Sequence, residues 1–260
     1  MPFRQSGSLH IFQLESLAHP DLDQAFFSRH GGVSPNPWRS LNLGGTVGDE
    51  RARVVENRAR AMAAAGRREE SLYEVWQVHS AEVVLAREPR GGAPLAQADA
   101  MITDNPRVTL LMRFADCVPI LLFDPVRGAI GIAHAGWLGT VRKTAQAAVR
   151  AMQDAFGTRP SDLLVGLGPS IGPDHYPVGD GVVAMMREAF GDEAEAHLQR
   201  GNAQAHLDLW SANRRLLEMA GVEKVEVADV CTACHVEDWY SHRGEGGRTG
   251  RFGALIGLRA

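Results

Sequence analysis

The sequence predicts a single α/β (α+β) domain spanning residues 1–260, with clustered, partly antiparallel strands. Three observations favour this class. The chain has 260 residues, enough for one sizeable core. Its 45% hydrophobic and 22% charged residues are typical of a globular protein. Helix-like and strand-like segments alternate without an internal repeat, and the one shift in composition, at residues 88–97, indicates an exposed loop rather than a linker.

Four segments are expected to be helices because their apolar residues recur at helical spacing or a glycine follows their last residue. The first has an acidic start and ends before Gly66, and the second ends before Gly157. The last two end before Gly191 and Gly221. The four predicted helices cover residues 49–65, 140–156, 181–190 and 207–220.

Short apolar runs predict the strands, with turn residues between them. The segment 107–134 is typical of strand, turn, strand, turn, strand. Within it, Asp124-Pro125 and Gly128 favour a tight hairpin. The predicted strands cover residues 25–28, 73–78, 82–86, 108–114, 118–123, 129–133, 163–167, 224–227 and 254–258.

Charge and apolar content exclude several classes. Lys and Arg total 27 against 31 Asp and Glu, a net charge of -4, so nucleic acid is not expected as a partner. No run reaches the ~18 apolar residues of a membrane span, and nothing resembles a secretory signal. We therefore expect a soluble, cytoplasmic protein. Three cysteines do not form a disulfide framework.

Three metal-binding residue types accompany predicted strands. His79 follows the strand 73–78, Cys117 lies within the apolar stretch 108–123, and His134 follows the strand 129–133. One thiolate and two imidazoles can hold zinc and leave a fourth position open. Asp116 would then orient a ligand or carry a proton.

Two other interpretations of these residues remain open. Each could be an isolated core residue, since the three are far apart in the chain. Alternatively, Cys117 and His134 could form a thiolate–imidazole pair for acyl transfer, with Asp116 or Gln77 as the orienting group. Residue types alone do not separate a metal site from a nucleophile.

Weaker signals lie in the loops. Cys231, Cys234 and His235 match the C-x-x-C-H pattern of haem attachment, but a structural role is favoured over a second zinc site or a redox pair. The loops 28–34, 168–173 and 241–251 are rich in glycine or arginine, which suits close approach to an anion such as phosphate. The chain has no P-loop motif.

Several short motifs together resemble one known family. The chain contains, in order, Ser28-Arg29 with Gly31-Gly-Val-Ser34, Leu41-Asn-Leu43, Trp76-Gln-Val-His79, Ala98-Asp-Ala100, Ala115-Asp-Cys-Val-Pro-Ile120 with Asp124-Pro125, His134-Ala-Gly-Trp137, Gly168-Pro-Ser-Ile-Gly-Pro173 and Thr249-Gly-Arg251. These strings resemble the YfiH/laccase-domain family, once called multicopper polyphenol oxidoreductases. The resemblance covers roughly residues 20 to 258.

The resemblance implies a compact α/β sandwich, in which mixed β-sheets are sandwiched with helices, similar to a Cys–His toxin deamidase domain. The family's zinc ligands fall on His79, Cys117 and His134, with copper as an adventitious or alternative metal. It implies phosphorolysis of adenosine, inosine and methylthioadenosine, together with adenosine deamination. The catalytic residues would be His79, Cys117, His134 and Asp116, and the small-molecule partners a nucleoside and phosphate. We expect substrate contacts from Arg29, Asn42, Gln77 and Arg243.

This chain departs from the family pattern at three places, none of them in the expected zinc set. Leu138 stands where an arginine is common, Asp174-His175 where one or two cysteines are common, and Gly244 where a second arginine is common. These changes bear on substrate specificity more than on metal binding.

Three other functions agree less well with the sequence. Some relatives are described as peptidoglycan editing factors, which would make the chain an amidase acting through Cys117 and His134 or through zinc. A non-catalytic binding protein is less compatible with an open metal position. A multicopper oxidase needs His-x-His pairs, and the chain has none.

Overall fold

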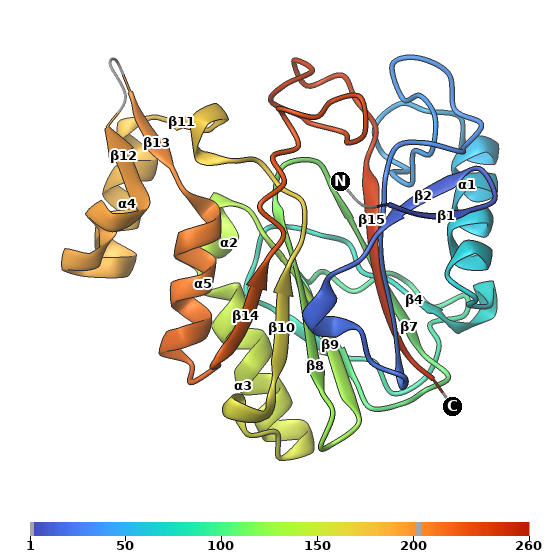
Figure 1. Ribbon diagram of the computed structural model, residues 1–260, viewed down its shortest axis with the longest axis horizontal. Helices are drawn as coiled ribbons and strands as arrows, with labels where there is room; N and C mark the ends of the chain where they lie inside the picture. The colour runs from blue at the N-terminus through green and yellow to red at the C-terminus, as the bar shows by residue number, and fades with distance from the viewer. Residues whose placement is uncertain (1–2, 201–203, 260) are drawn as a thin grey trace.

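Two mixed sheets packed face to face, with helices on both outer sides, form the body of the molecule (Figure 1). The computed structural model describes residues 3–200 and 204–259. Its arrangement is a four-layer α/β/β/α sandwich, in agreement with the predicted α+β class. The chain passes between the two sheets more than once: β1 to β4 lie in the first sheet, β5 and β6 in the second, β7 in the first, β8 to β10 and β14 in the second, and the C-terminal strand β15 in the first.

The first sheet has the order β1-β2-β3-β15-β7-β4. Neighbouring strands are antiparallel, except that β4 runs parallel to β7. Its central strand, β15, comes from the C-terminal end of the chain and pairs on either side with β3 and β7. The strands are β1 (Arg4–Ser6), β2 (Leu9–Phe12), β3 (Leu22–Phe27), β4 (Leu72–Tyr73), β7 (Thr109–Phe114) and β15 (Phe252–Leu258).

The second sheet has the order β14-β10-β8-β9-β6-β5. The β8–β9 hairpin at its centre confirms the predicted turn, because Asp124 Oδ1 accepts the backbone N–H groups of Val126 and Arg127, and Gly128 has φ 61°. The strands are β5 (Val83–Leu85), β6 (Ala100–Thr103), β8 (Val118–Asp124), β9 (Ala129–Ala135), β10 (Leu164–Leu167) and β14 (Lys224–Val227).

Alternation along the strands divides the core into layers. On β8, Val118, Ile120 and Leu122 pack toward the helices, whereas Leu121 and Phe123 pack between the two sheets. All five are at most 1% exposed. Burying one such side chain contributes about 1.5–3 kcal/mol relative to leaving it in water. This double burial holds the central hairpin in place, and with it the functional residues at its end.

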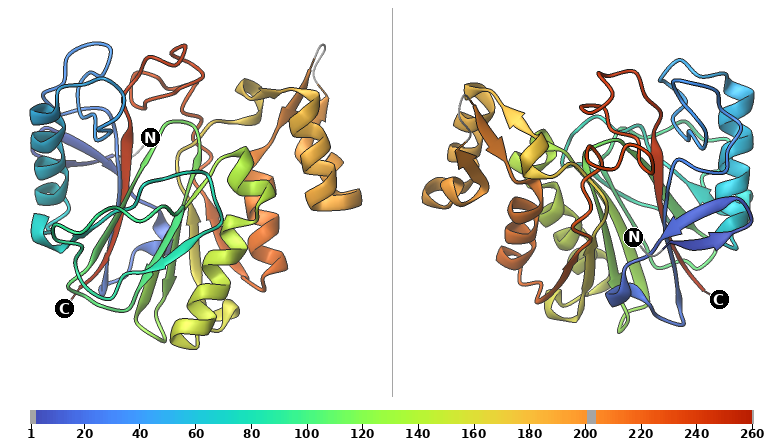
Figure 2. Two further views of the ribbon diagram at one scale, coloured as in Figure 1. Left: turned by 180° about the vertical axis from the view of Figure 1, so that it is seen from behind. Right: turned by 45° about the horizontal axis from the view of Figure 1, so that its top comes forward.

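Helices cover the outer face of each sheet (Figure 2). On the second sheet lie α2 (Trp137–Val141), α3 (Thr144–Phe156) and α5 (Leu209–Met219), and on the first lies α1 (Arg51–Ala64). At one end of the molecule, α4 (Asp180–Phe190) lies with a small sheet of β11 (Pro177–Val178), β13 (Ala205–Leu207) and β12 (Leu198–Arg200). Single 3-10 turns are η1 (Glu15–Leu17), η2 (Glu69–Ser71), η3 (Pro160–Asp162) and η4 (Pro173–His175), and η5 (Gly191–His197) is a longer 3-10 helix.

Two predicted elements are wrong. The strand expected at 73–78 is only the two-residue β4, because Glu74 turns toward arginines of α1 and β7 instead of continuing the ladder. The helix expected at 140–156 is broken in two. Lys143 adopts the left-handed conformation (φ 63°), and the Thr144 hydroxyl donates a hydrogen bond to the Gly139 carbonyl.

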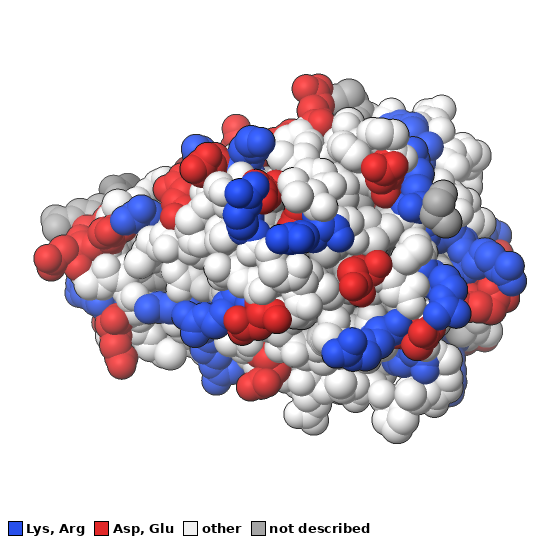
Figure 3. All heavy atoms as spheres, turned by 90° about the horizontal axis from the view of Figure 1, so that it is seen from below, with Lys and Arg blue, Asp and Glu red and all other residues white. Residues whose placement is uncertain are grey.

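Charged side chains of both signs are interspersed on the face seen in Figure 3. That distribution agrees with the small net charge and shows no single basic patch on this face. Among the described residues, no helix combines the length and the apolar character that crossing a membrane would need.

Candidate metal centre and active-site cavity

Cys117 lies in the short turn that carries the chain from β7 in the first sheet to β8 in the second. The turn is tight, and Asp116 adopts a left-handed φ of 87°. Both Asp116 carboxylate oxygens are occupied, since Oδ1 accepts the Thr232 hydroxyl at 2.8 Å and Oδ2 the Arg243 backbone N–H at 2.7 Å. The Ile171 N–H also donates to the Asp116 carbonyl at 2.9 Å. These contacts fix the backbone next to the thiol.

His134 lies within β9, because this strand continues two residues beyond the predicted end at Ala133. Its ring Nδ1 is 2.8 Å from Oδ1 of Asp99, a carboxylate with no exposed surface. The His134 backbone N–H also donates to the Asp99 carbonyl at 2.8 Å. A histidine tied through Nδ1 to a carboxylate has its ring orientation fixed and presents Nε2 as the free ligand atom.

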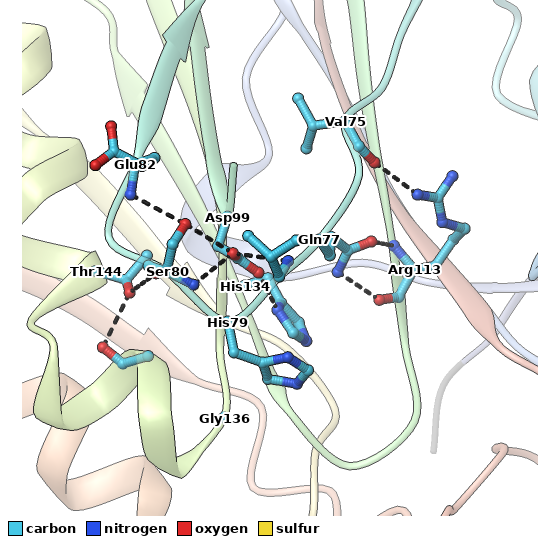
Figure 4. Close-up of polar contacts among 12 residues, drawn as sticks. Val75, Gln77, His79, Ser80, Glu82, Asp99, Arg113, His134, Gly136 and Thr144 are labelled. Carbon is cyan, nitrogen blue, oxygen red and sulfur yellow. Dashed lines mark hydrogen bonds and ion pairs between the residues drawn. The ribbon is translucent and has the colours of Figure 1, made fainter. Parts of the chain in front are cut away.

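His79 stands in a loop rather than at a strand end, and has φ 58°. The same Asp99 carboxylate holds this loop: Oδ2 accepts the backbone N–H groups of Val78 at 3.0 Å and Ser80 at 2.6 Å. Figure 4 shows Asp99 between the Ser80 backbone and the His134 ring, with His79 beside them. One buried carboxylate thus positions two of the three candidate ligands.

The three candidate ligands converge, as the metal interpretation requires. The ligand atoms of His79, Cys117 and His134 all lie within 4.8 Å of one another. The backbone comes close at this point, because a Cβ placed on Gly136 would lie 2.5 Å from the Cys117 Sγ. This His/Cys/His set suits zinc, which favours nitrogen and sulfur donors.

Mutual electrostatics favour the charged forms of this cluster. Burial alone would raise the pKa of the Cys117 thiol, but the His134 and His79 imidazoles outweigh it and lower that pKa to about 6. Burial likewise opposes protonation of His134, yet Cys117 and Asp99 raise its pKa to about 9. Asp99 is buried too, and its hydrogen bonds from His134, Ser80 and Val78 still lower its pKa to about 2.

The cluster opens onto a cavity of about 670 Å³. Its aromatic wall includes Trp76, Trp137 and Tyr176. Four guanidinium groups also line it, and they differ in their partners. Those of Arg58 and Arg113 pair with the buried Glu74, at 3.1 and 2.8 Å. Those of Arg243 and Arg251 have no carboxylate within 4.0 Å among residues 3–200 and 204–259. Arg243 Nη1 donates to the Pro177 carbonyl at 2.9 Å and Arg251 Nη1 to the Gly250 carbonyl at 2.8 Å, so the remaining N–H groups of these two cations are available to an anion.

The four expected substrate contacts divide into two pairs. Gln77 and Arg243 line the cavity, although the Gln77 side-chain amide donates its Nε2–H to the Arg113 carbonyl at 2.9 Å and accepts the Arg113 N–H on Oε1 at 3.0 Å. Arg29 and Asn42 are not among its lining residues. The Arg29 guanidinium bonds Glu245 at 3.1 Å, and the fully buried Asn42 accepts the N–H groups of Gly44 and Arg251 at 2.9 Å each. Both hold loops that border the cavity.

Sequence reasoning assigned no role to several residues that the structure places here. Asp99 and Arg251 stood within recognised motifs, but their partners are distant in the chain, so no spacing revealed them. Glu74 could have been noticed in the sequence, because it is an isolated acidic residue within the mainly apolar run 73–78. Of the three departures from the family pattern, Leu138 lies on α2, His175 on η4, and Gly244 in the loop after Ser241.

The chain matches known proteins over most of its length. Residues 23–259 match the family model described as multi-copper polyphenol oxidoreductase laccase. The chain belongs to this family. A purine nucleoside phosphorylase of Deinococcus radiodurans is 42% identical over 96% of this chain and 93% of its own length. The purine nucleoside phosphorylase YlmD of Bacillus subtilis is 36% identical over 90% and 87%.

Solved structures of the laccase family share the fold. YlmD from Geobacillus stearothermophilus superposes with a TM-score of 0.92, at 35% identity and 99% coverage of each chain. The YfiH protein of Bacillus licheniformis gives 0.91, at 31% identity and the same coverage. The family and fold expected from the motifs are confirmed.

Proposed function

We propose that this chain is a zinc-dependent purine nucleoside phosphorylase that also deaminates adenosine. The observation that carries the proposal is the His79, Cys117 and His134 cluster at a cavity of about 670 Å³, with two arginines that have no carboxylate partner within the described part of the chain. The names of the similar proteins support the phosphorylase part. Its substrates are adenosine, inosine and methylthioadenosine, each cleaved by phosphate to a free base and a (methylthio)ribose 1-phosphate.

The donor set fits zinc. One thiolate and two imidazoles are its preferred ligands, and Asp99 supplies the carboxylate that commonly supports a metal-bound histidine. Zinc held there would supply Lewis acidity that polarises a bound oxygen. Copper remains an alternative metal, but a multicopper oxidase mechanism is disfavoured because the chain lacks any His-x-His pair.

The cavity wall offers separate places for the base and for phosphate. Trp76, which is 48% exposed, and Trp137 present aromatic faces against which a purine can stack. Arg243 and Arg251 would hold the phosphate, since guanidinium groups bind phosphate oxygens in pairs of hydrogen bonds. Arg243 already lies over the Tyr176 ring, 5.0 Å from its centroid, which limits its freedom. In phosphorolysis a phosphate oxygen forms the new bond to the anomeric carbon as the bond to the base breaks.

Asp116 has an orienting role in this proposal. Its carboxylate is occupied by Thr232 and by the Arg243 backbone, so it connects the Cys117 turn to the loop that carries the phosphate contact. The proton on His134 Nδ1 is held by Asp99. The proposed setting is the cytoplasm, a reducing compartment that suits three free cysteines.

The test is product analysis with zinc-loaded protein and adenosine, with and without phosphate. We expect adenine and ribose 1-phosphate only when phosphate is present, and some inosine and ammonia without it. Cys117→Ala should lose the zinc held by the His79, Cys117 and His134 cluster, and both activities should fall at least 100-fold. Cys117→Ala with full zinc content and full activity would contradict the proposal. Arg68→Lys, at an exposed position outside the cavity, serves as the control.

One observation favours the alternative, an amidase that edits a peptidoglycan precursor. Cys117, whose pKa lies near 6, stands beside His134, which is oriented by Asp99, and this order of groups also suits a nucleophilic thiolate. Release of a free amino acid from a nucleotide-sugar peptide, by protein that has been stripped of zinc, would distinguish this function from nucleoside cleavage.

A further inference from the structure

A second group of metal-binding side chains lies outside the cavity cluster. His175 on η4, Cys231 and Cys234 bring their ligand atoms within 4.8 Å of one another. We propose that these three residues form a second zinc site in this chain. The site shares no residue with the His79, Cys117 and His134 cluster, and it does not depend on the proposed function.

The distances suit tetrahedral zinc. The Nδ1 of His175 lies 3.5 Å from the Cys234 Sγ and 3.8 Å from the Cys231 Sγ. With Zn–S bonds of about 2.3 Å and Zn–N bonds of about 2.0–2.1 Å, a nitrogen and a sulfur on tetrahedral zinc are about 3.6 Å apart. Both nitrogen–sulfur separations therefore already match those that one shared ion requires, and the two sulfurs lie within 4.8 Å of each other.

The surroundings of Cys231 suit a thiolate. Its side chain is buried, and the Gly172 backbone N–H donates to its Sγ at 3.1 Å. A hydrogen bond to the charged form of a group favours that form, and zinc binds the thiolate. Cys234 and His175 are exposed, so an ion can enter from solvent and a water molecule can occupy the fourth position.

Sequence spacing alone points to a different third ligand. In the Cys-x-x-Cys-His pattern the adjacent histidine is His235, but its Nδ1 lies 3.3 Å from the Glu237 carboxylate. The imidazole that meets the two sulfurs comes from His175, 56 residues before Cys231. This contact exists because the two segments run side by side, with Ser170 paired to Cys231 in an isolated parallel bridge.

Zinc at this position would tie together two loops that border the cavity. The segment 168–176 donates the Ile171 N–H to the Asp116 carbonyl and carries Tyr176 in the wall. The segment after Cys231 donates the Thr232 hydroxyl to the Asp116 carboxylate. A metal bridge between them would thus hold Asp116 from both sides, without touching the substrate.

The experiment counts zinc in Cys117→Ala protein, so that the cavity cluster does not contribute. Metal-free, reduced protein is incubated with Zn²⁺, desalted, and measured by mass spectrometry of the element. We expect one zinc per chain. Adding Cys234→Ser or His175→Ala should weaken zinc binding at least 10-fold and bring the count to zero. The matched control, His235→Ala, should keep one zinc, with affinity changed less than 2-fold.

The absorption of bound Co²⁺ gives a second measurement on Cys117→Ala protein, in which His175, Cys231 and Cys234 are unchanged. Co²⁺ added to Cys117→Ala protein should produce thiolate-to-cobalt absorption, which disappears with Cys234→Ser and persists with His235→Ala. Circular dichroism checks that each variant is folded. No bound zinc in the Cys117→Ala protein would overturn the proposal, as would a zinc count unaffected by both His175→Ala and Cys234→Ser. A Cys231–Cys234 disulfide that forms again after reduction and excludes zinc would identify a redox pair instead.

Discussion

At the scale of single residues, Asp99 supports the candidate metal centre, and its removal has two expected effects. Asp99→Asn should weaken zinc binding 10–100-fold, because the His134 ring loses the carboxylate that orients it. In metal-free protein it should also lower the free energy of unfolding at pH 7 by about 2 kcal/mol, since the pKa of Asp99 falls from 3.8 to about 2 on folding. Urea denaturation measures this.

The stability difference between wild type and Asp99→Asn should depend on pH. The folded-state pKa of Asp99 is depressed, so its contribution is complete above pH 4 and is lost as the pH falls toward 2. The stability gap between wild type and Asp99→Asn should therefore narrow below pH 4. Asp104→Asn, at an exposed position, should show no gap at any pH. A gap that stays constant down to the lowest pH at which the protein folds would show that Asp99 acts by packing alone.

Residues such as Asp99 also mark the limit of inference from sequence. His79, Cys117 and His134 could be chosen because their residue types suit zinc, and the structure brings them together. Asp99 could not, since carboxylates are common and its partner His134 is 35 residues away. Arg29 was expected at the substrate because an arginine among glycines suits an anion. Its guanidinium is instead used by Glu245, 216 residues away.

At the scale of elements, the start of α2 lies directly against the Cys117 thiol. Gly136 is the N-cap of α2 with φ -79°, a conformation open to any residue, so alanine would introduce no backbone strain. Its Cβ would nevertheless stand 2.5 Å from the Cys117 Sγ. We expect Gly136→Ala to displace the thiol and weaken zinc binding at least 10-fold, measured by competition with a chromophoric chelator.

The fold offers a matched control for that substitution. Gly179 is the N-cap of α4 with φ -82°, and a Cβ there meets nothing within 4 Å. Gly179→Ala should therefore leave zinc affinity unchanged within 2-fold. Equal loss of affinity in both variants would mean that alanine acts through helix capping rather than through contact with sulfur.

Helices and strands could be predicted where the residues that determine them are neighbours in the sequence. The β8–β9 hairpin followed from apolar runs separated by Asp124-Pro125 and Gly128, and those residues make the turn. The strand expected at 73–78 failed, since Glu74 is drawn away by Arg58 and Arg113 from other elements. β6 was missed altogether. It is four residues long and pairs between β9 and β5, a position that no pattern within it reveals.

At the scale of the whole molecule, the order of layers was beyond the reach of sequence. The central strands β8 and β9 are buried on both faces, so they form continuous apolar runs. Such runs predict a core strand but do not say that one face meets helices and the other meets a second sheet. Cys117 occupies the turn that joins those two sheets, and the candidate metal centre therefore lies where the layers are connected.

Zinc bound at that junction should stabilise the entire fold. Its candidate ligands come from the loop before β5, from the inter-sheet turn and from β9, and unfolding separates them. A ligand at 100 times its Kd stabilises the folded state by about 2.7 kcal/mol, which corresponds to a rise in Tm of about 5–10 °C for a chain of this size. Calorimetry of Cys234→Ser, which lacks the second proposed site, should show this rise with Zn²⁺. The Cys117→Ala/Cys234→Ser protein should show none. An equal rise in both would mean that zinc stabilises the fold from elsewhere, and the link between this junction and global stability would fail.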